Sequence, residues 1–218
     1  MMNDEKDVVV ILSGGLDSTT VLYKLLDEGK NPIALTFNYG QKATKEINCA
    51  KEICEEKGVE HHVFDISSIL DLLNASSLID RDNDNLEEPE NTVVPSRNTI
   101  LLSLATAFAI SNDRKAVYYG AHKGDENDYP DCTPEFLNQM NELNKVNNYD
   151  YIPIYAPFIH VEKSEVVKEA IRLGVPIEKT WSCYNDVEKP CLHCPTCLDR
   201  QKAFEANGIE DPALKRYQ

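Results

Sequence analysis

The sequence lacks the features that mark membrane, secreted and nucleic-acid-binding proteins. No apolar run approaches the roughly 20 residues that cross a bilayer, and the polar residues 1–7 have no hydrophobic signal-peptide region. The 22 Lys and Arg residues are outnumbered by 37 Asp and Glu residues, for a formal net charge of -15. Tight binding to a phosphate backbone normally needs a basic surface. We therefore expect a cytoplasmic protein that acts on a small molecule, with no membrane partner and no direct nucleic acid partner.

Two common phosphate-binding motifs are also missing. Neither the Walker-type G-x-x-x-x-G-K-[ST] nor the dinucleotide motif G-x-G-x-x-G occurs in the chain. Residues 8–12 form a short β-branched apolar run that predicts a strand buried on both faces, and residues 16–28 carry a helical pattern that ends at Gly29. The turn between them, residues 13–15, is Ser-Gly-Gly. A glycine turn before a helix N-terminus presents unpaired N–H groups to an anion, so this segment is a candidate phosphate site.

The hexapeptide at residues 13–18, Ser-Gly-Gly-Leu-Asp-Ser, resembles the pyrophosphate loop of the ATP pyrophosphatase (PP-loop) superfamily. Enzymes of that superfamily hold ATP by its outer phosphates and transfer AMP to a substrate oxygen. The alternative is a serine- and glycine-rich turn that binds no ligand. The resemblance implies that one continuous segment binds ATP, with its acidic residue as a candidate Mg²⁺ contact: Leu12, Ser13, Gly14, Gly15, Leu16, Asp17, Ser18, Thr19, Thr20, Val21 and Leu22.

Strand and helix patterns alternate along the rest of the chain. Residues 33–39, 61–66 and 116–121 are predicted strands, and 151–158 an edge strand or extended loop. Predicted helices cover 42–57, 67–78, 99–110, 134–145, 163–173 and 196–207, of which 99–110 is apolar enough to require burial; the acidic stretch 80–90 is a predicted surface loop. The alternation predicts an α/β fold with a doubly wound, mostly parallel sheet. The superfamily resemblance implies the adenine nucleotide alpha hydrolase-like, Rossmann-like version of this fold over residues 1–178.

Four of the seven cysteines crowd together near the C-terminus, at Cys183, Cys191, Cys194 and Cys197. In a cytoplasmic protein, disulfides are disfavoured, and four thiolates are a common structural zinc set. An iron–sulfur cluster is the competing interpretation, because C-x₂-C-x₂-C also occurs in cluster motifs. We expect Zn²⁺ and a small zinc-binding helical tail over residues 179–218, in which the metal has a structural role.

Several short motifs, taken together, resemble one family of the superfamily, the 7-cyano-7-deazaguanine synthases of queuosine-type base biosynthesis. They run in order along nearly the whole chain: residues 13–20, residues 94–98 (Val-Pro-Ser-Arg-Asn), residues 129–132 (Tyr-Pro-Asp-Cys), residues 163–165 (Lys-Ser-Glu) and residues 180–185 followed by three cysteines. The chain departs from the family pattern at Asp128, where Gly is common, and at residues 121–125, where many members have Cys-Glu-Thr-Asp.

The resemblance implies an ATP-dependent carbon–nitrogen ligase. The family converts 7-carboxy-7-deazaguanine and ammonia to the nitrile through an adenylated carboxylate and an amide, and its members are usually homodimers. The matching positions give five candidate catalytic residues: Asp17 and Ser18 at the phosphates, Arg97 and Lys163 at the α-phosphate or the substrate carboxylate, and Asp131 at the N–H edge of the base. The cofactors implied are ATP, Mg²⁺ and Zn²⁺.

Three other functions share parts of this pattern. A related enzyme that stops at the amide, or a tRNA-base thiolation or ligation enzyme, would carry the same phosphate loop. The acidic composition and the absence of an added RNA-binding segment disfavour the tRNA enzyme. The third alternative is a zinc-stapled module that binds a nucleotide without turning it over.

Overall fold

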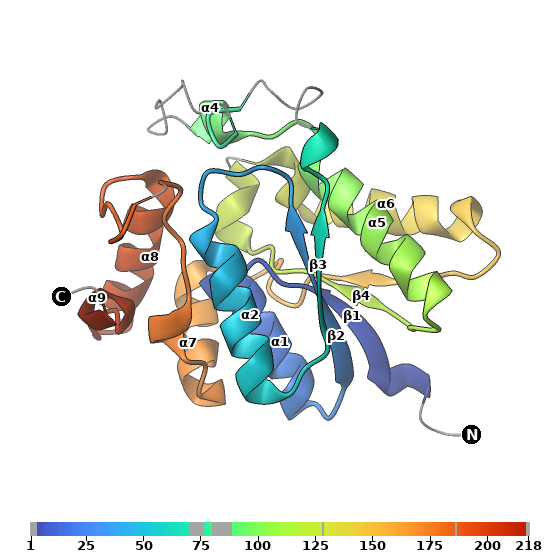
Figure 1. Cartoon of the computed structure of the whole chain (residues 1–218), viewed down its shortest axis with the longest axis horizontal. Helices are drawn as coiled ribbons and strands as arrows, with labels where there is room; N and C mark the ends of the chain where they lie inside the picture. The colour runs from blue at the N-terminus through green and yellow to red at the C-terminus, as the bar shows by residue number, and fades with distance from the viewer. Residues whose placement is uncertain (1–3, 70–75, 80–88, 128, 186, 217–218) are drawn as a thin grey trace.

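A computed structural model of the chain describes residues 4–69, 76–79, 89–127, 129–185 and 187–216. Five parallel strands form one sheet in the order β3-β2-β1-β4-β5 (Figure 1). Their bounds are β1 Asp7–Ile11, β2 Asn31–Asn38, β3 His61–Asp65, β4 Val117–Tyr118 and β5 Ile154–Tyr155. The predicted parallel α/β architecture is therefore confirmed.

Helices cover both faces of the sheet (Figure 1). One face packs against α1 (Leu16–Asp27), α2 (Lys45–Lys57) and α7 (Lys163–Leu173), and the other against α5 (Arg97–Ser111) and α6 (Pro134–Asn147). Beyond α7 lie α8 (Pro195–Ala206) and α9 (Ala213–Arg216). The short elements are α4 Pro89–Thr92 and the 3₁₀ turns Asp4–Lys6, Ser67–Ile69, Lys123–Asn127, Pro130–Cys132 and Ile177–Lys179.

The central strand β1 is apolar from Val8 to Ile11 because helices cover both of its faces. Val8 and Val10 point into the core beneath α1 and α7, whereas Val9 points into the core beneath α5 and α6, and all three are fully buried. Successive strand residues face opposite sides of a sheet, so a strand covered on both sides needs apolar residues at every position. The predicted burial of residues 8–12 is confirmed for Val8, Val9, Val10 and Leu12, whereas Ile11 is partly buried.

Other expectations were met in part. Only Val117–Tyr118 of the predicted strand 116–121 is regular strand. The predicted helix 67–78 begins as a 3₁₀ turn, its residues 70–75 lie outside the described residues, and residues 76–79 form a bend and turn. Of the predicted loop 80–90, residues 80–88 also lie outside them. Helix α5 is not wholly buried, because Leu102, Ala105 and Ala109 face the core while Leu104 is 40% exposed.

The C-terminal segment packs closely on the rest of the chain. Phe204 of α8 belongs to the same core as α1 and α7, and the Trp181 backbone N–H donates to the Gly14 carbonyl at 3.0 Å. The separation of a tail at residue 179 stays a prediction. Within the described ranges, no helix is both long and apolar enough to cross a bilayer.

Candidate active site

The turn after β1 is an ordered loop tied to the start of α1. The Ser13 and Ser18 hydroxyls lie 3.0 Å apart, and the Gly15 N–H donates to the Ser13 hydroxyl at 3.2 Å. Gly14 has a φ of +91°, and a Cβ there would lie 2.0 Å from the Glu46 carbonyl oxygen. Only glycine permits both the left-handed backbone and the close approach of α2, so the tight packing of these elements explains the residue.

A cavity of about 570 Å³ opens where β1, β2 and β4 reach their carboxyl ends. This is the edge at which open parallel sheets bind ligands. A Cβ at Gly120, just after β4, would lie 2.8 Å from the Ser18 amide nitrogen, so this glycine lets β4 approach the loop. The polar residues that line the cavity include Ser13, Asp17, Ser18, Tyr39, Gln41, Glu46, Arg97, Tyr129, Lys163, Tyr184 and Asp199.

At one end of the cavity, here called the loop end (Ser13, Asp17, Ser18, Lys163 and Asp199), the charges are paired. Lys163 Nζ lies 3.1 Å from Asp17 Oδ2 and 3.2 Å from Asp199 Oδ2. Burial opposes ionisation of both Lys163 and Asp17, but their mutual attraction outweighs it, which raises the pKa of Lys163 and lowers the pKa of Asp17. The loop end therefore holds a permanent ammonium beside the phosphate loop.

His122 is packed behind this ion pair. Its ring is 1% exposed, and Nε2 lies 3.3 Å from Lys163 Nζ and 3.4 Å from Asp125 Oδ1. Burial raises the pKa of Asp125, although the charges of His122 and Lys163 oppose the rise. The histidine thus lies between Lys163 and Asp125, within contact distance of both.

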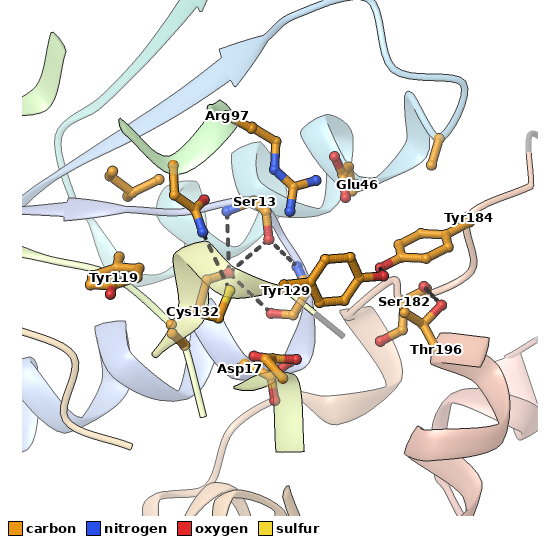
Figure 2. A pocket seen from close by; sticks show the side chains of 18 of the residues that line it. Ser13, Asp17, Glu46, Arg97, Tyr119, Tyr129, Cys132, Ser182, Tyr184 and Thr196 are labelled. Atoms are coloured by element: carbon orange, nitrogen blue, oxygen red, sulfur yellow. Dashed lines mark hydrogen bonds between the residues drawn. The ribbon is translucent and has the colours of Figure 1, made fainter. Parts of the chain in front are cut away.

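The opposite end, here called the tyrosine end (Tyr39, Glu46, Arg97, Tyr129 and Tyr184), is built differently. The Tyr129 and Tyr184 hydroxyls lie 3.1 Å apart, and Thr92 Oγ1 is 2.7 Å from the Tyr129 hydroxyl. Figure 2 shows Arg97 and Glu46 on the same side of these two rings. Fixed aromatic rings beside charged groups suit a flat, polar ligand.

Arg97 begins α5 with few internal contacts. The residue before it, Ser96, has a φ of +56°, a sparsely populated conformation for a residue with a side chain. The guanidinium donates to the Tyr39 hydroxyl at 3.4 Å, and no ion pair within the described ranges involves it. Burial disfavours its charge, but Tyr39 and Tyr184 favour it and the pKa of Arg97 is raised. Its fork of N–H donors remains available for a carboxylate or phosphate.

Of the predicted ATP-binding residues, the structure brings Leu12, Ser13, Gly15, Asp17 and Ser18 to the cavity. The others support this segment from behind: Leu16, Val21 and Leu22 are fully buried in the core, and the Thr19 and Thr20 hydroxyls donate to backbone carbonyls of Gly15 and Leu16. Gly14 faces α2, as described above.

Of the predicted catalytic residues, Asp17, Ser18, Arg97 and Lys163 line the cavity. Asp131 is not among the lining residues. Its Oδ2 accepts the Asn98 backbone N–H at 3.1 Å, in the first turn of α5, and its carbonyl accepts from the Asn98 side chain. A carboxylate at this position satisfies an otherwise unpaired helix donor. The predicted contact of Asp131 with a base stays a prediction.

Glu46 on α2, Asp199 on α8 and Tyr184 beside Cys183 line the cavity but are not among the candidate site residues that the sequence predicts. The only available signal for Glu46 was its position in the first turn of the helix after the second strand, at the edge of the sheet where ligands bind. Asp199 and Tyr184 reach the cavity through the fold of the C-terminal segment, which the local pattern does not reveal.

The four C-terminal cysteines form one cluster. Their sulfur atoms all lie within 4.8 Å of one another, and tetrahedral coordination at about 2.3 Å would place sulfurs about 3.8 Å apart. The Cys191 N–H donates to Cys183 Sγ at 3.4 Å, and the Cys194 N–H donates to Cys191 Sγ at 3.3 Å. Such N–H donors stabilise thiolates, so the donor set fits a thiophilic metal ion.

Comparison with known proteins identifies relatives along nearly the full chain. A family described as "Queuosine biosynthesis protein QueC" matches residues 7–208. The chain is 49% identical over 213 residues to a 7-cyano-7-deazaguanine synthase of Psychromonas ingrahamii, covering 95% of this chain and 96% of the relative. It is 47% identical over 210 residues to 7-cyano-7-deazaguanine synthase 1 of Colwellia psychrerythraea, covering 94% and 96%.

More distant solved structures share the fold. An NMN synthetase from Francisella tularensis has a TM-score of 0.56 at 17% identity, covering 98% of this chain and 82% of that one. The U34-tRNA thiolase NcsA of Methanococcus maripaludis, solved with its [4Fe-4S] cluster, has a TM-score of 0.54 at 19% identity, covering 98% and 72%. At this identity the likeness concerns the fold alone.

Proposed function

The chain belongs to the family of queuosine biosynthesis protein QueC, and from this membership we propose that it converts 7-carboxy-7-deazaguanine and ammonia to 7-cyano-7-deazaguanine with ATP. The single observation that best supports this activity in the chain itself is the two-ended cavity. One cavity joins a phosphate loop with its lysine to a tyrosine-walled end whose guanidinium has no ion pair among the described residues. Such a site can hold ATP and a flat carboxylic acid together.

The chemistry requires activation of the acid. A carboxylate is a poor acyl donor because oxide would have to leave. Attack of a carboxylate oxygen on the α-phosphorus of ATP releases pyrophosphate and gives an acyl adenylate, from which AMP leaves when ammonia attacks. The resulting amide oxygen is adenylated by a second ATP, and loss of AMP and two protons from the amide nitrogen gives the nitrile.

Lys163 and Arg97 stabilise the charge in these steps. The Lys163 ammonium, fixed by Asp17 and Asp199, lies beside the phosphate loop and balances negative charge on the phosphoryl oxygens. The Arg97 guanidinium lies on the tyrosine end and orients the substrate carboxylate. Ser13 and Ser18 add hydroxyl donors to the phosphates.

Two metal ions complete the proposal. Asp17 Oδ1 is buried without a hydrogen-bond partner among the described residues, which suits a Mg²⁺ ion held with the ATP phosphates. Zn²⁺ fits the four cysteine thiolates and would fix the segment that carries Tyr184 and Asp199. We place the enzyme in the cytoplasm, where ATP is available and thiols stay reduced.

The protein is also proposed to form a homodimer. Phe64 on the edge strand β3 is 37% exposed, and Leu104 on α5 is 40% exposed. The ring contact of Phe64 with Phe108, at 5.9 Å, joins β3 and α5 into one apolar face. A second copy would bury this face. Light scattering should give twice the chain mass for the protein and the chain mass for Leu104→Lys; a monomeric parent protein contradicts the proposal.

One incubation tests the activity. The protein is mixed with ATP, Mg²⁺, ammonium and 7-carboxy-7-deazaguanine, and mass spectrometry follows the base and the nucleotide. Nitrile together with AMP is the expected result. Amide alone would identify a relative that performs only the first half-reaction. An unchanged base, with folded and metal-loaded protein, would overturn the substrate assignment.

A further inference from the structure

The carboxylates of the cavity differ in their partners. Asp17 and Asp199 pair with Lys163, and Asp125 lies 3.4 Å from His122. Glu46 takes part in no ion pair among the described residues, although burial strongly disfavours a lone charge. Burial raises the pKa of Glu46 to about 7, against the opposing effects of the Gln41 hydrogen bond and the Arg97 charge. The ionised Glu46 carboxylate therefore has too few hydrogen-bond donors around it, and a ligand could supply the missing ones.

The position of Glu46 is fixed by its neighbours. Gln41 Nε2 donates to Glu46 Oε1 at 2.9 Å and to the Phe37 carbonyl at 3.3 Å, while Gln41 Oε1 accepts the Tyr39 N–H at 3.0 Å. These three contacts set the orientation of the Gln41 amide, which is 4% exposed. Glu46 itself stands in the first turn of α2, directly against the phosphate loop at Gly14.

The chemistry of the tyrosine end then matches one class of base. A guanine-type base presents two adjacent donors, N1–H and the 2-amino group, next to the acceptor O6. In 7-carboxy-7-deazaguanine the carboxylate lies beside O6. Arg97 and Glu46 line the cavity on the same side of the tyrosine rings (Figure 2), and the charge of Arg97 acts on the Glu46 carboxyl, so one ligand can meet a donor group and an acceptor group there.

We propose that Glu46, held by Gln41, is the specificity-determining residue that accepts hydrogen bonds from the N1–H and 2-amino donors of the deazaguanine base. The Arg97 guanidinium then donates to O6 and to the 7-carboxylate of the same base. The rings of Tyr129 and Tyr184 contact the flat face of that base. The assignment rests on the proposed function, because it takes the substrate to be a deazaguanine acid. It differs from the role predicted for Asp131, whose carboxylate caps the first turn of α5.

The test uses calorimetry to measure how tightly the parent protein and several variants bind each of two ligands. The ligands are 7-carboxy-7-deazaguanine and its analogue without the 2-amino group. The parent protein should bind the first about 10- to 100-fold more tightly, the discrimination of a two-donor contact. Glu46→Ala and Glu46→Gln should weaken binding of the first ligand about 10- to 100-fold and bring the two ligands to within about 3-fold of each other.

Glu55→Gln is the matched control: it changes an exposed carboxylate on the same helix and should keep the parental discrimination. Asp131→Asn tests the competing assignment of the base contact to Asp131. If Glu46 is the acceptor, this variant keeps the discrimination, because Asp131 is not among the cavity-lining residues.

Loss of discrimination in Asp131→Asn, or retention of it in both Glu46 variants, overturns the proposal. So does a parent protein that binds both ligands equally or binds neither. Turnover is scored separately: a parent protein that makes nitrile but fails the binding test contradicts the assignment of Glu46 and leaves the proposed function standing.

Discussion

Both ends of the cavity carry charged groups, but only those of the loop end have charged partners within the described residues. At the loop end, Lys163 already has two carboxylate partners at 3.1 and 3.2 Å. At the tyrosine end, Arg97 and Glu46 have opposite charges, yet each has a single hydrogen bond from or to a neutral side chain among the described residues. Lys163 at the loop end has its carboxylate partners before any ligand arrives, whereas Arg97 and Glu46 at the tyrosine end lack charged partners that a ligand can provide.

The difference follows from what each end must hold. Phosphate groups change charge during adenylation, so a fixed cation positioned in advance stabilises the developing charge without reorganisation. A base has to be chosen among similar molecules, and buried polar groups left without partners penalise every ligand that fails to match them. The loop end thus serves the chemistry and the tyrosine end serves the choice of substrate.

The largest loss of activity is expected from a variant that removes the ion pairs of the loop end. Lys163→Met removes the ammonium beside the phosphate loop and leaves Asp17 buried without its cation. We expect about a 10³-fold or greater loss of AMP formation, and a stability loss of about 3–5 kcal/mol from the unpaired carboxylate. Binding of the base should survive, because the tyrosine end is untouched. Lys168→Met, at a 69% exposed lysine side chain of the same helix, is the control, and a loss of activity below tenfold in Lys163→Met contradicts this role.

The next variant tests whether the cysteine cluster supports both ends. Asp199 and Tyr184, one at each end of the cavity, belong to the segment that the four cysteines hold together. Cys194→Ser should lower the amount of bound zinc. It should also lower the melting temperature by about 10 °C and the activity about 100-fold. KM should rise for both ATP and the base. Cys54→Ala, a buried cysteine outside the cluster, should keep the zinc; measured iron in place of zinc would contradict the metal assignment.

A smaller effect, confined to the tyrosine end, is expected from Arg97→Lys. The lysine keeps the charge but cannot donate two parallel hydrogen bonds to a carboxylate. KM for the base should rise about 10- to 100-fold while KM for ATP changes less than about 3-fold. Steady-state kinetics with each substrate varied in turn provide the measurement. An equal rise in both KM values would place Arg97 at the phosphates instead.

The loop end could be predicted largely from the sequence, since its signals are local. A β-branched run, a double glycine and a helical pattern lie next to one another at residues 8–28, and α7 has the predicted bounds Lys163–Leu173 with Gly174 just beyond it. The cysteine spacing was similarly informative. These features depend on neighbouring residues, so the pattern alone is enough to locate them.

The tyrosine end could not be predicted in the same way. A glutamate in the first turn of an amphipathic helix normally faces solvent and complements the helix dipole. Glu46 enters the cavity only because Gly14 and Gln41 bring the loop, β2 and α2 together. Conversely, Asp131 is close in sequence to the predicted pocket, but its carboxylate binds the Asn98 N–H. Helix α5 was expected to be buried on every side, and exposed Leu104 shows that local apolarity does not identify what covers it.

The smallest predicted effect concerns stability and follows from the unpaired state of Glu46. In the unfolded chain its pKa is near 4.5, and in the folded protein burial raises the pKa to about 7. Between these values the folded state keeps a proton that the unfolded state releases, so stability falls as the pH rises and stays lower above pH 7. The Gln41 hydrogen bond and the Arg97 charge favour the ionised carboxylate, and they offset only part of the cost of the buried charge.

Glu46→Gln removes that charge and keeps an oxygen for the Gln41 N–H. The free energy of unfolding of the variant should therefore exceed that of the parent by about 1–3 kcal/mol at pH 8. At pH 4.5 the two values should be nearly equal. Urea unfolding at the two pH values measures this, with Glu55→Gln as the control. Adding 7-carboxy-7-deazaguanine should narrow the gap at pH 8, because the ligand stabilises the parent more than the variant. If the difference in the free energy of unfolding does not depend on pH, Glu46 is already paired in the free protein. The two ends of the cavity would then not differ in the way described.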